Sequence, residues 1–180
     1  MNELNGDHLT KIMSRPEWDD EVLALLELCE EERVDLGDMY TKNIYVEKFG
    51  IKLKFSADLN SEKQREEAEA GNLYLQGISF YDESTISLPF GLKWGDERNV
   101  CVQKIKECSQ IVHLFRTRTE KAQIDSYLLE DEDKKYFFKL KFTEDEEVLT
   151  ESIVSFVWDI DMDLNKNYMP KKISIEEALK

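Results

Sequence analysis

The chain has 180 residues, enough to bury a hydrophobic core in one domain without disulfides or metal ions. With 41% hydrophobic residues it is not an intrinsically disordered chain, and its formal net charge is −15, from 39 acidic and 24 basic residues. That charge would repel nucleic acid and anionic membranes and attract basic partners, although solubility alone also explains an acidic composition. Acidity is concentrated in residues 1–90, with 20 acidic and 9 basic residues against 19 and 15 in residues 91–180.

The first ninety residues predict a helix, a hairpin and a charged segment. Residues 1–13 are polar and weakly patterned, and they indicate a loose N-terminus or a short helix. Next, a capping box formed by Ser14 and Glu17 predicts the start of an amphipathic helix, whose apolar stripe is Trp18, Val22, Leu25, Leu26 and Cys29 and whose segment ends at Gly37.

A hairpin follows. Residues 40–48 and 51–57 alternate as two strands that turn at Phe49-Gly50. Residues 58–70 have almost no apolar side chain, which predicts an exposed charged loop or helix.

Residues 71–108 carry the strongest structural signals. The first part of this stretch predicts a strand with four apolar residues, Leu73, Leu75, Ile78 and Phe80. These residues fall on one face of the strand only if Gln76-Gly77 inserts an extra residue, as a β-bulge does. A Pro-Gly break then ends the strand, and Asp96 is placed to cap the helix that follows.

The remaining residues predict four strands and a short tail. The strands are expected at 111–116, 124–129, 135–142 and 152–158, and the tail from residue 165 contains a capping box, Ser174 to Glu177. Strands joined by short turns favour an α+β fold, an antiparallel β-sheet with helices packed on one face. We expect a single domain, 1–180, and the repeated helix-then-strands order suggests two degenerate halves.

Residues with catalytic or metal-binding chemistry are sparse. His8 and His113 stand apart, no nucleophile or phosphate-loop motif occurs, and we expect neither an enzyme nor a cofactor. Residues 159–165 begin like a calcium loop, but Leu164 replaces the glycine and Pro170 the bidentate glutamate, so no metal site is predicted.

The three cysteines, Cys29, Cys101 and Cys108, lie on apolar faces of expected helices and predict core residues in a reducing compartment. Residues 1–15 contain no hydrophobic run of a signal peptide, and no stretch approaches the ~20 apolar residues of a membrane span. We therefore expect a cytoplasmic protein.

Two acidic clusters form a candidate binding surface. If the last three strands form a meander, the turn at residues 130–133 and the segment after the last strand emerge at the same end of the sheet. This acidic rim contains Glu130, Asp131, Glu132, Asp133, Asp159, Asp161 and Asp163, with Trp158 beside it as a candidate anchor. The alternatives are that acidic residues simply populate hairpin turns and that Trp158 is a core residue.

Residues 71–106 carry a family resemblance. Gly77–Tyr81 reads GISFY and Leu88–Asp96 reads LPFGLKWGD, a pattern that resembles small immunity proteins of bacterial contact-dependent growth inhibition and related polymorphic toxin systems. Ile105–Cys108 stands where the pattern has a Leu-Gly-x-Pro exit. The resemblance implies a cytosolic protein that binds one cognate toxin domain, usually a nuclease or other hydrolase, and occludes its active site.

The charge is consistent with such a partner, because a basic toxin domain would be steered toward an acidic inhibitor. Two alternatives from other classes are an acidic secretion chaperone or adaptor, which would form a stable homodimer, and a DNA mimic with carboxylates spaced like phosphates. The acid-rich helix over residues 17–33 is a second candidate for the partner surface.

Overall fold

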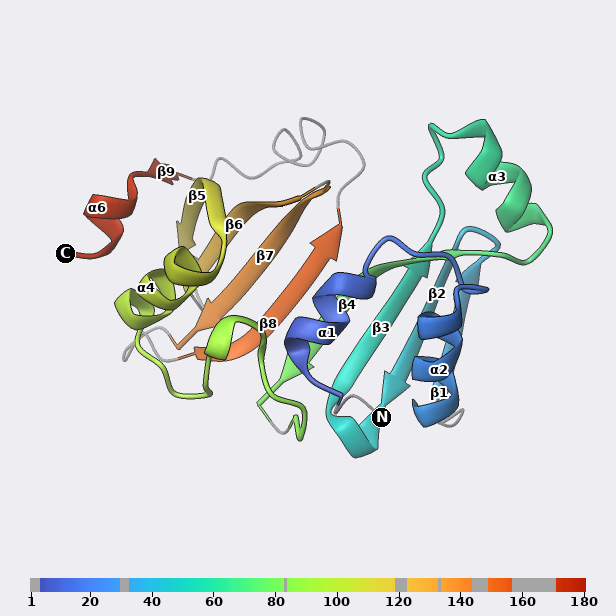
Figure 1. Ribbon diagram of the computed structural model, residues 1–180, viewed down its shortest axis with the longest axis horizontal. Coiled ribbons are helices and arrows are strands. Elements are labelled where there is room, and N and C mark those ends of the chain that lie inside the picture. Colours follow the sequence, from blue (N-terminus) through green and yellow to red (C-terminus); the bar gives the residue numbers. More distant parts are fainter. Residues whose placement is uncertain are drawn as a thin grey trace. The chain divides into compact units, whose positions relative to one another are not determined.

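The chain forms two compact units, shown in Figure 1. Unit 1 is Met1–Ile86 and unit 2 is Ser87–Lys180 in this computed structural model. The structure describes residues 4–29, 33–82, 84–118, 123–132, 134–143, 149–156 and 171–180, with the backbone alone for residues 33–36 and 150–156. Each unit combines helices with antiparallel strands, which confirms the predicted α+β fold class. Folding as a single domain, and descent of the halves by duplication, stay predictions.

Unit 1 is an antiparallel sheet with helices. Its elements in chain order are α1 (Gly6–Ile12), α2 (Asp20–Cys29), β1 (Arg33–Asp38), β2 (Thr41–Val46), the short 3₁₀ turn η1 (Glu47–Phe49), β3 (Ile51–Ser56), α3 (Glu62–Glu69) and β4 (Tyr74–Tyr81). The strands pair in the order β1-β2-β3-β4. Figure 1 shows α1 and α2 on one face of these strands and α3 near one end of them.

The predicted hairpin and bulge of unit 1 are both confirmed. Gly50 takes a left-handed conformation (φ 61°) in the turn before β3, where glycine has no steric penalty. Along β3 the buried residues alternate with more exposed ones, and the buried ones are Ile51, Leu53 and Phe55. Phe55 pairs with Leu75 and Lys54 with Gly77, so Gln76 is the extra residue of a β-bulge. The bulge keeps Leu75, Ile78 and Phe80 on one face of the sheet, the face that also carries the buried residues of β3.

Of the two alternatives for residues 1–13, the short helix is the one that forms, over residues 6–12, with Leu9 and Ile12 fully buried. Two other N-terminal predictions need correction. The next helix begins at Asp20 and not after Ser14, because residues 14–17 instead form hydrogen bonds with the chain at Leu73–Leu75. Residues 33–38 form a strand paired with β2 where the sequence predicted the end of a helix.

Unit 2 contains a five-stranded antiparallel sheet. Its elements are the 3₁₀ turn η2 (Pro89–Gly91), α4 (Arg98–Cys108), β5 (Gln110–Arg118), β6 (Gln123–Asp131), β7 (Lys134–Phe142), β8 (Leu149–Phe156), β9 (Lys171–Ile173) and α6 (Ile175–Ala178). The strand order is β8-β7-β6-β5-β9. Figure 1 shows α4 in front of this sheet. The predicted cap of the last helix is confirmed, because the Ser174 side chain accepts a hydrogen bond from the backbone N–H of Glu177.

The core of unit 2 lies mainly on the face of the sheet that carries the alternating residues of β7. These residues, Tyr136, Phe138, Leu140 and Phe142, are all buried, as predicted. Phe90 packs its ring edge-on against Phe138 with centroids 5.1 Å apart, and this contact holds Phe90 in a left-handed conformation (φ 60°) that side chains rarely adopt. Phe137, which interrupts the lysines of β7, is buried with Phe115 and Leu128 in a second cluster.

Two predictions at α4 are wrong. Asp96 does not cap the helix: its carboxylate accepts hydrogen bonds from the backbone N–H of Lys93 and from the side chain of Lys104, while Glu97 occupies the N-cap position. Cys108 is exposed, because it lies at the end of α4, beyond the buried positions Cys101 and Ile105. Cys29 and Cys101 are buried, as expected.

Candidate functional site

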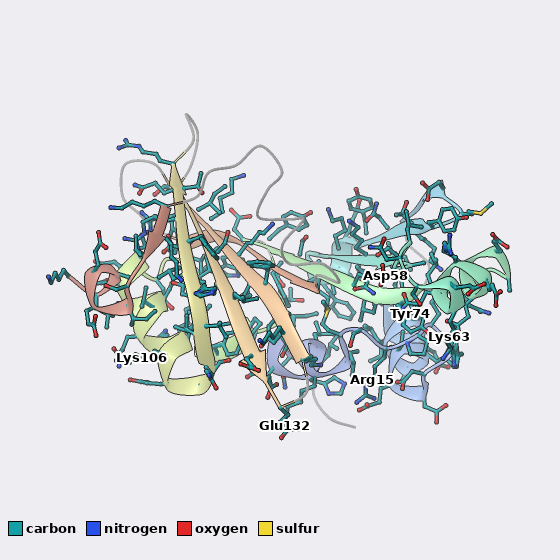
Figure 2. The ribbon with its side chains drawn as sticks, turned by 90° about the horizontal axis from the view of Figure 1, so that it is seen from above. Arg15, Asp58, Lys63, Tyr74, Lys106 and Glu132 are labelled. Carbon is teal, nitrogen blue, oxygen red and sulfur yellow. The ribbon has the colours of Figure 1, made fainter. Side chains whose placement is uncertain are left out.

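Three carboxylates of the acidic rim, those of Glu130, Asp131 and Glu132, lie at the turn between β6 and β7. Glu132 lies at the tip of this hairpin, as Figure 2 shows, with φ +36°. Glu130 is opposite Lys135 in the strand register, their charged atoms 3.9 Å apart, and Asp131 is opposite Lys134. Two lysines therefore stand against the three described carboxylates, which weakens the negative potential expected at this end of the sheet.

The rest of the rim lies outside the residues that the structure describes. These residues are Asp133, Trp158, Asp159, Asp161 and Asp163, and the calcium-like run 159–165 lies there as well. The predicted meander itself is confirmed: β7 pairs with β6 on one side and β8 on the other, and Phe156 at the end of β8 is opposite Tyr136 at the start of β7. The rim as a binding surface stays a prediction.

A buried ionic cluster in unit 2 was not predicted. The fully buried carboxylate of Asp125 accepts hydrogen bonds from the Nε atoms of Arg98 (3.0 Å) and Arg116 (2.9 Å), and Arg98 also donates to the side chain of Gln123. Asp125 lies on the same face of β6 as the buried residues Tyr127 and Leu129. The sequence signal for this cluster was an aspartate at a core-facing position of a strand, because a buried charge is almost always paired with an opposite charge.

This cluster has the geometry of a structural ion pair. Arg98 is in the first turn of α4, Asp125 is in β6 and Arg116 is directly opposite Asp125 in β5, so the ion pairs join the helix to two strands. A polar pocket of about 230 Å³ lies beside it, lined by both arginines and by Glu97, Glu177 and Lys180. Opposite charges alternate in this lining, and we assign it no ligand.

His113, in β5, lacks the surroundings of a catalytic base. Burial, followed by the charges of Lys172 and Lys135, lowers the pKa of His113. Its Nδ1 atom has no hydrogen-bond partner among the residues that the structure describes, and its ring packs against Phe115. A general base needs a partner that orients it and a proton within reach. Among the described side chains, no three His, Cys, Asp or Glu residues are grouped as a metal site requires.

Unit 1 presents a different kind of surface, around Trp18. The sequence placed Trp18 in a buried helical stripe, but it precedes α2 and is 46% exposed. Its ring packs edge-on against Tyr74, with centroids 5.7 Å apart. Tyr74 is buried and donates a 2.6 Å hydrogen bond to Glu67 of α3. In Figure 2 Tyr74 lies between α3 and the blue helices.

The two neighbours of Trp18 in the chain are held by hydrogen bonds. Glu17 accepts bonds from the backbone N–H of Leu73 (3.0 Å) and from the Lys42 side chain (2.6 Å). Asp19 caps α2 by accepting a hydrogen bond from the backbone N–H of Glu21 (3.0 Å). Trp18 is therefore a half-exposed aromatic side chain on a fixed backbone, the kind of group that anchors protein interfaces.

Net negative charge and exposed large apolar side chains occur together on unit 1. It contains 20 acidic and 9 basic residues, since residues 87–90 are uncharged. Among the side chains that the structure describes, six large apolar ones are exposed, and five belong to unit 1: Trp18, Leu23, Leu28, Met39 and Leu59. The sixth, Val100, is in unit 2. The sequence named the acid-rich segment 17–33 only as a second candidate for the partner surface, and it placed Trp18 in an apolar helical stripe rather than on the surface.

Comparison of the chain with family models, curated proteins and solved structures finds no match. The resemblance to immunity proteins therefore rests on residues 71–106 alone. Within the described part of the chain, no helix has the length and apolar character needed to cross a bilayer.

Proposed function

We propose that this chain is an immunity protein that binds a cognate bacterial toxin domain in the cytoplasm and occludes its active site. The observation that carries the proposal is the coincidence, on unit 1, of a net charge of −11 with most of the exposed large apolar side chains. Tight protein interfaces combine buried apolar anchors with charges complementary to the partner. A basic nuclease is the toxin class that this charge suits best, because its nucleic-acid cleft is lined with lysine and arginine.

The resemblance of residues 71–106 supports the same class, and the structure gives those residues a structural role. Gly77–Tyr81 forms most of the strand β4, and residues 88–96 form the turn η2 and the approach to α4. Phe80 is fully buried and Phe90 is nearly so. A shared pattern in such positions reflects a shared fold, whereas the surface that recognises one toxin is expected elsewhere, on exposed residues.

A second candidate is an acidic secretion chaperone or adaptor. It is favoured by the exposed leucines of α2, Leu23 and Leu28, because chaperones of this kind pair or bind clients through an apolar helix face. A stable homodimer of the isolated chain would support this alternative. Sedimentation equilibrium over a wide protein concentration range distinguishes it from a monomeric inhibitor.

Co-expression tests the proposed function. The chain is expressed together with the toxin domain encoded in the adjacent reading frame, and growth is compared with that of cells producing the toxin domain alone. We expect restored growth and a complex that co-purifies, with an association rate that falls as salt concentration rises. Unchanged toxicity with the chain expressed at equal level would contradict the proposal.

A further inference from the structure

The solvent-facing side of α2 has a specific composition. At 3.6 residues per turn, Val22, Leu25 and Cys29 lie on one side of the helix, and all three are buried. The opposite side, which we call the α2 outer face, consists of Asp20, Leu23, Ala24, Glu27 and Leu28. Leu23 (49% exposed) and Leu28 (40% exposed) lie on either side of the line through Asp20, Ala24 and Glu27.

Asp20 and Glu27, the carboxylates of this face, form no ion pair with the residues that the structure describes. α2 itself contains no lysine or arginine. The neighbouring Glu21 differs, because it pairs with Arg15. Lysine or arginine side chains of a partner could therefore pair with these two carboxylates.

We propose that the α2 outer face, with Trp18 at its N-terminal end, is the central contact for the basic toxin domain, an inference that rests on the proposed function. Leu23, Leu28 and Trp18 lose their contact with water in the complex, which supplies the apolar anchor. Asp20 and Glu27 receive lysine or arginine side chains from the rim of the toxin's cleft.

Two comparisons favour this face over the β6–β7 hairpin. At the hairpin Glu130 already faces Lys135, and none of its described large apolar side chains is exposed. On the α2 outer face, Asp20 and Glu27 form no ion pair with any described residue, and Leu23 and Leu28 lie beside them. A helix of ten residues is about 15 Å long. It supplies part of the roughly 800 Å² that each partner of a stable complex buries, so other segments of the chain complete the interface.

The test measures binding of the toxin domain to the full chain and to paired variants. Leu23→Ser with Leu28→Ser should raise Kd at least about tenfold, mainly through faster dissociation. The matched control is Met39→Ser with Leu59→Ser, which removes two apolar side chains of unit 1 that are even more exposed and should change Kd less than about threefold. Circular dichroism and thermal unfolding of each variant report whether it is folded.

Charge reversal provides a second, independent measurement. Asp20→Lys with Glu27→Lys should slow association at least about tenfold and reduce its salt dependence, whereas Asp131→Lys with Glu132→Lys should have a smaller effect. If folded α2 variants bind as the wild type does, or if only the hairpin variants lose binding, the α2 assignment is overturned. If the wild-type chain itself does not bind the toxin domain, the proposed function fails, and the α2 assignment fails with it.

Discussion

The guanidinium of Arg98 and the carboxylate of Asp125 form an ion pair inside unit 2, with the arginine Nε atom 3.0 Å from both carboxylate oxygens. Asp125 is fully buried and Arg98 is nearly so. Arg116 donates to the same carboxylate from the neighbouring strand. The first turn of α4 is thereby attached to β5 and β6 through one acidic side chain.

Removing that side chain should destabilise the protein strongly. Asp125→Ala leaves Arg98 buried without its counter-charge, and we expect the free energy of unfolding to fall by about 3–5 kcal/mol. Urea unfolding followed by circular dichroism measures this change. The control is Lys63→Ala, because the Lys63 side chain is 79% exposed and its amine lies 3.8 Å from Glu67, so its loss should cost less than about 1 kcal/mol. Similar effects of the two substitutions would contradict a structural role for the buried pair.

Tyr74 should titrate at unusually high pH. Burial, followed by its hydrogen bond to Glu67 and the charge of that carboxylate, raises the pKa of Tyr74 to about 12 from its ordinary value of 10.0. Because the folded pKa is the higher one, Tyr74 contributes stability that is fully present below pH 10 and is lost as the pH rises toward about 12.

Tyrosinate absorbance of the wild type minus that of Tyr74→Phe isolates this titration. We expect a midpoint near pH 12 while the chain stays folded, and a lower midpoint in Glu67→Gln, where the carboxylate charge is absent. A midpoint at the ordinary tyrosine value in the folded protein would show that Tyr74 is neither buried nor bonded to Glu67.

Cys108 should be the cysteine that reacts with thiol reagents in the native protein. It is exposed, whereas Cys29 and Cys101 are buried, and burial together with nearby Asp96 raises the pKa of the Cys101 thiol to about 12. Thiol reagents react with the thiolate, so Cys101 is protected by its environment as well as by its inaccessibility. Mass spectrometry of alkylated native protein should find the label on Cys108, and alkylation in urea should label all three. Native labelling of Cys101 at the rate of Cys108 would contradict this arrangement.

Substitution of Glu132 by glycine should stabilise the β6–β7 hairpin. Glu132 has φ +36°, a region that side chains adopt at a cost and that glycine enters freely. We expect Glu132→Gly to raise the free energy of unfolding by about 0.5–1 kcal/mol. Asp131→Gly is the control at the adjacent strand residue, where glycine should lower stability by a similar amount. Equal destabilisation by both substitutions would show that the turn does not strain Glu132.

The elements with short-range signals were predicted most accurately. The strand at residues 135–142, the hairpin turning at Gly50 and the bulge at Gln76 were all identified from alternation and glycine placement. These signals involve residues close in the chain, and the steric and burial preferences that produce them operate locally. The strand β1 was missed because its partner β2 determines its conformation more than its own residues do.

The side chains that matter for a site were predicted less well. Ser14, Pro16 and Glu17 have the pattern of a helix start, yet backbone hydrogen bonds from Ser14 to Leu75 and from Glu17 to Leu73 keep this segment out of the helix. Asp19 caps the helix instead. Trp18 consequently lies outside the helix and is half exposed. No local pattern carries this information, because the competing hydrogen-bond partner is more than fifty residues away.

The sequence by itself determined the α+β class, the antiparallel strands of residues 41–56 and 110–142 and the excess of acid in the first half. Each follows from composition or from periodicity along a short stretch of chain. Only the tertiary structure decided that Asp125 is buried between two arginines and that Leu23, Leu28 and Trp18 face solvent. Whether a side chain is buried depends on what packs against it, and segments distant in the chain supply that packing.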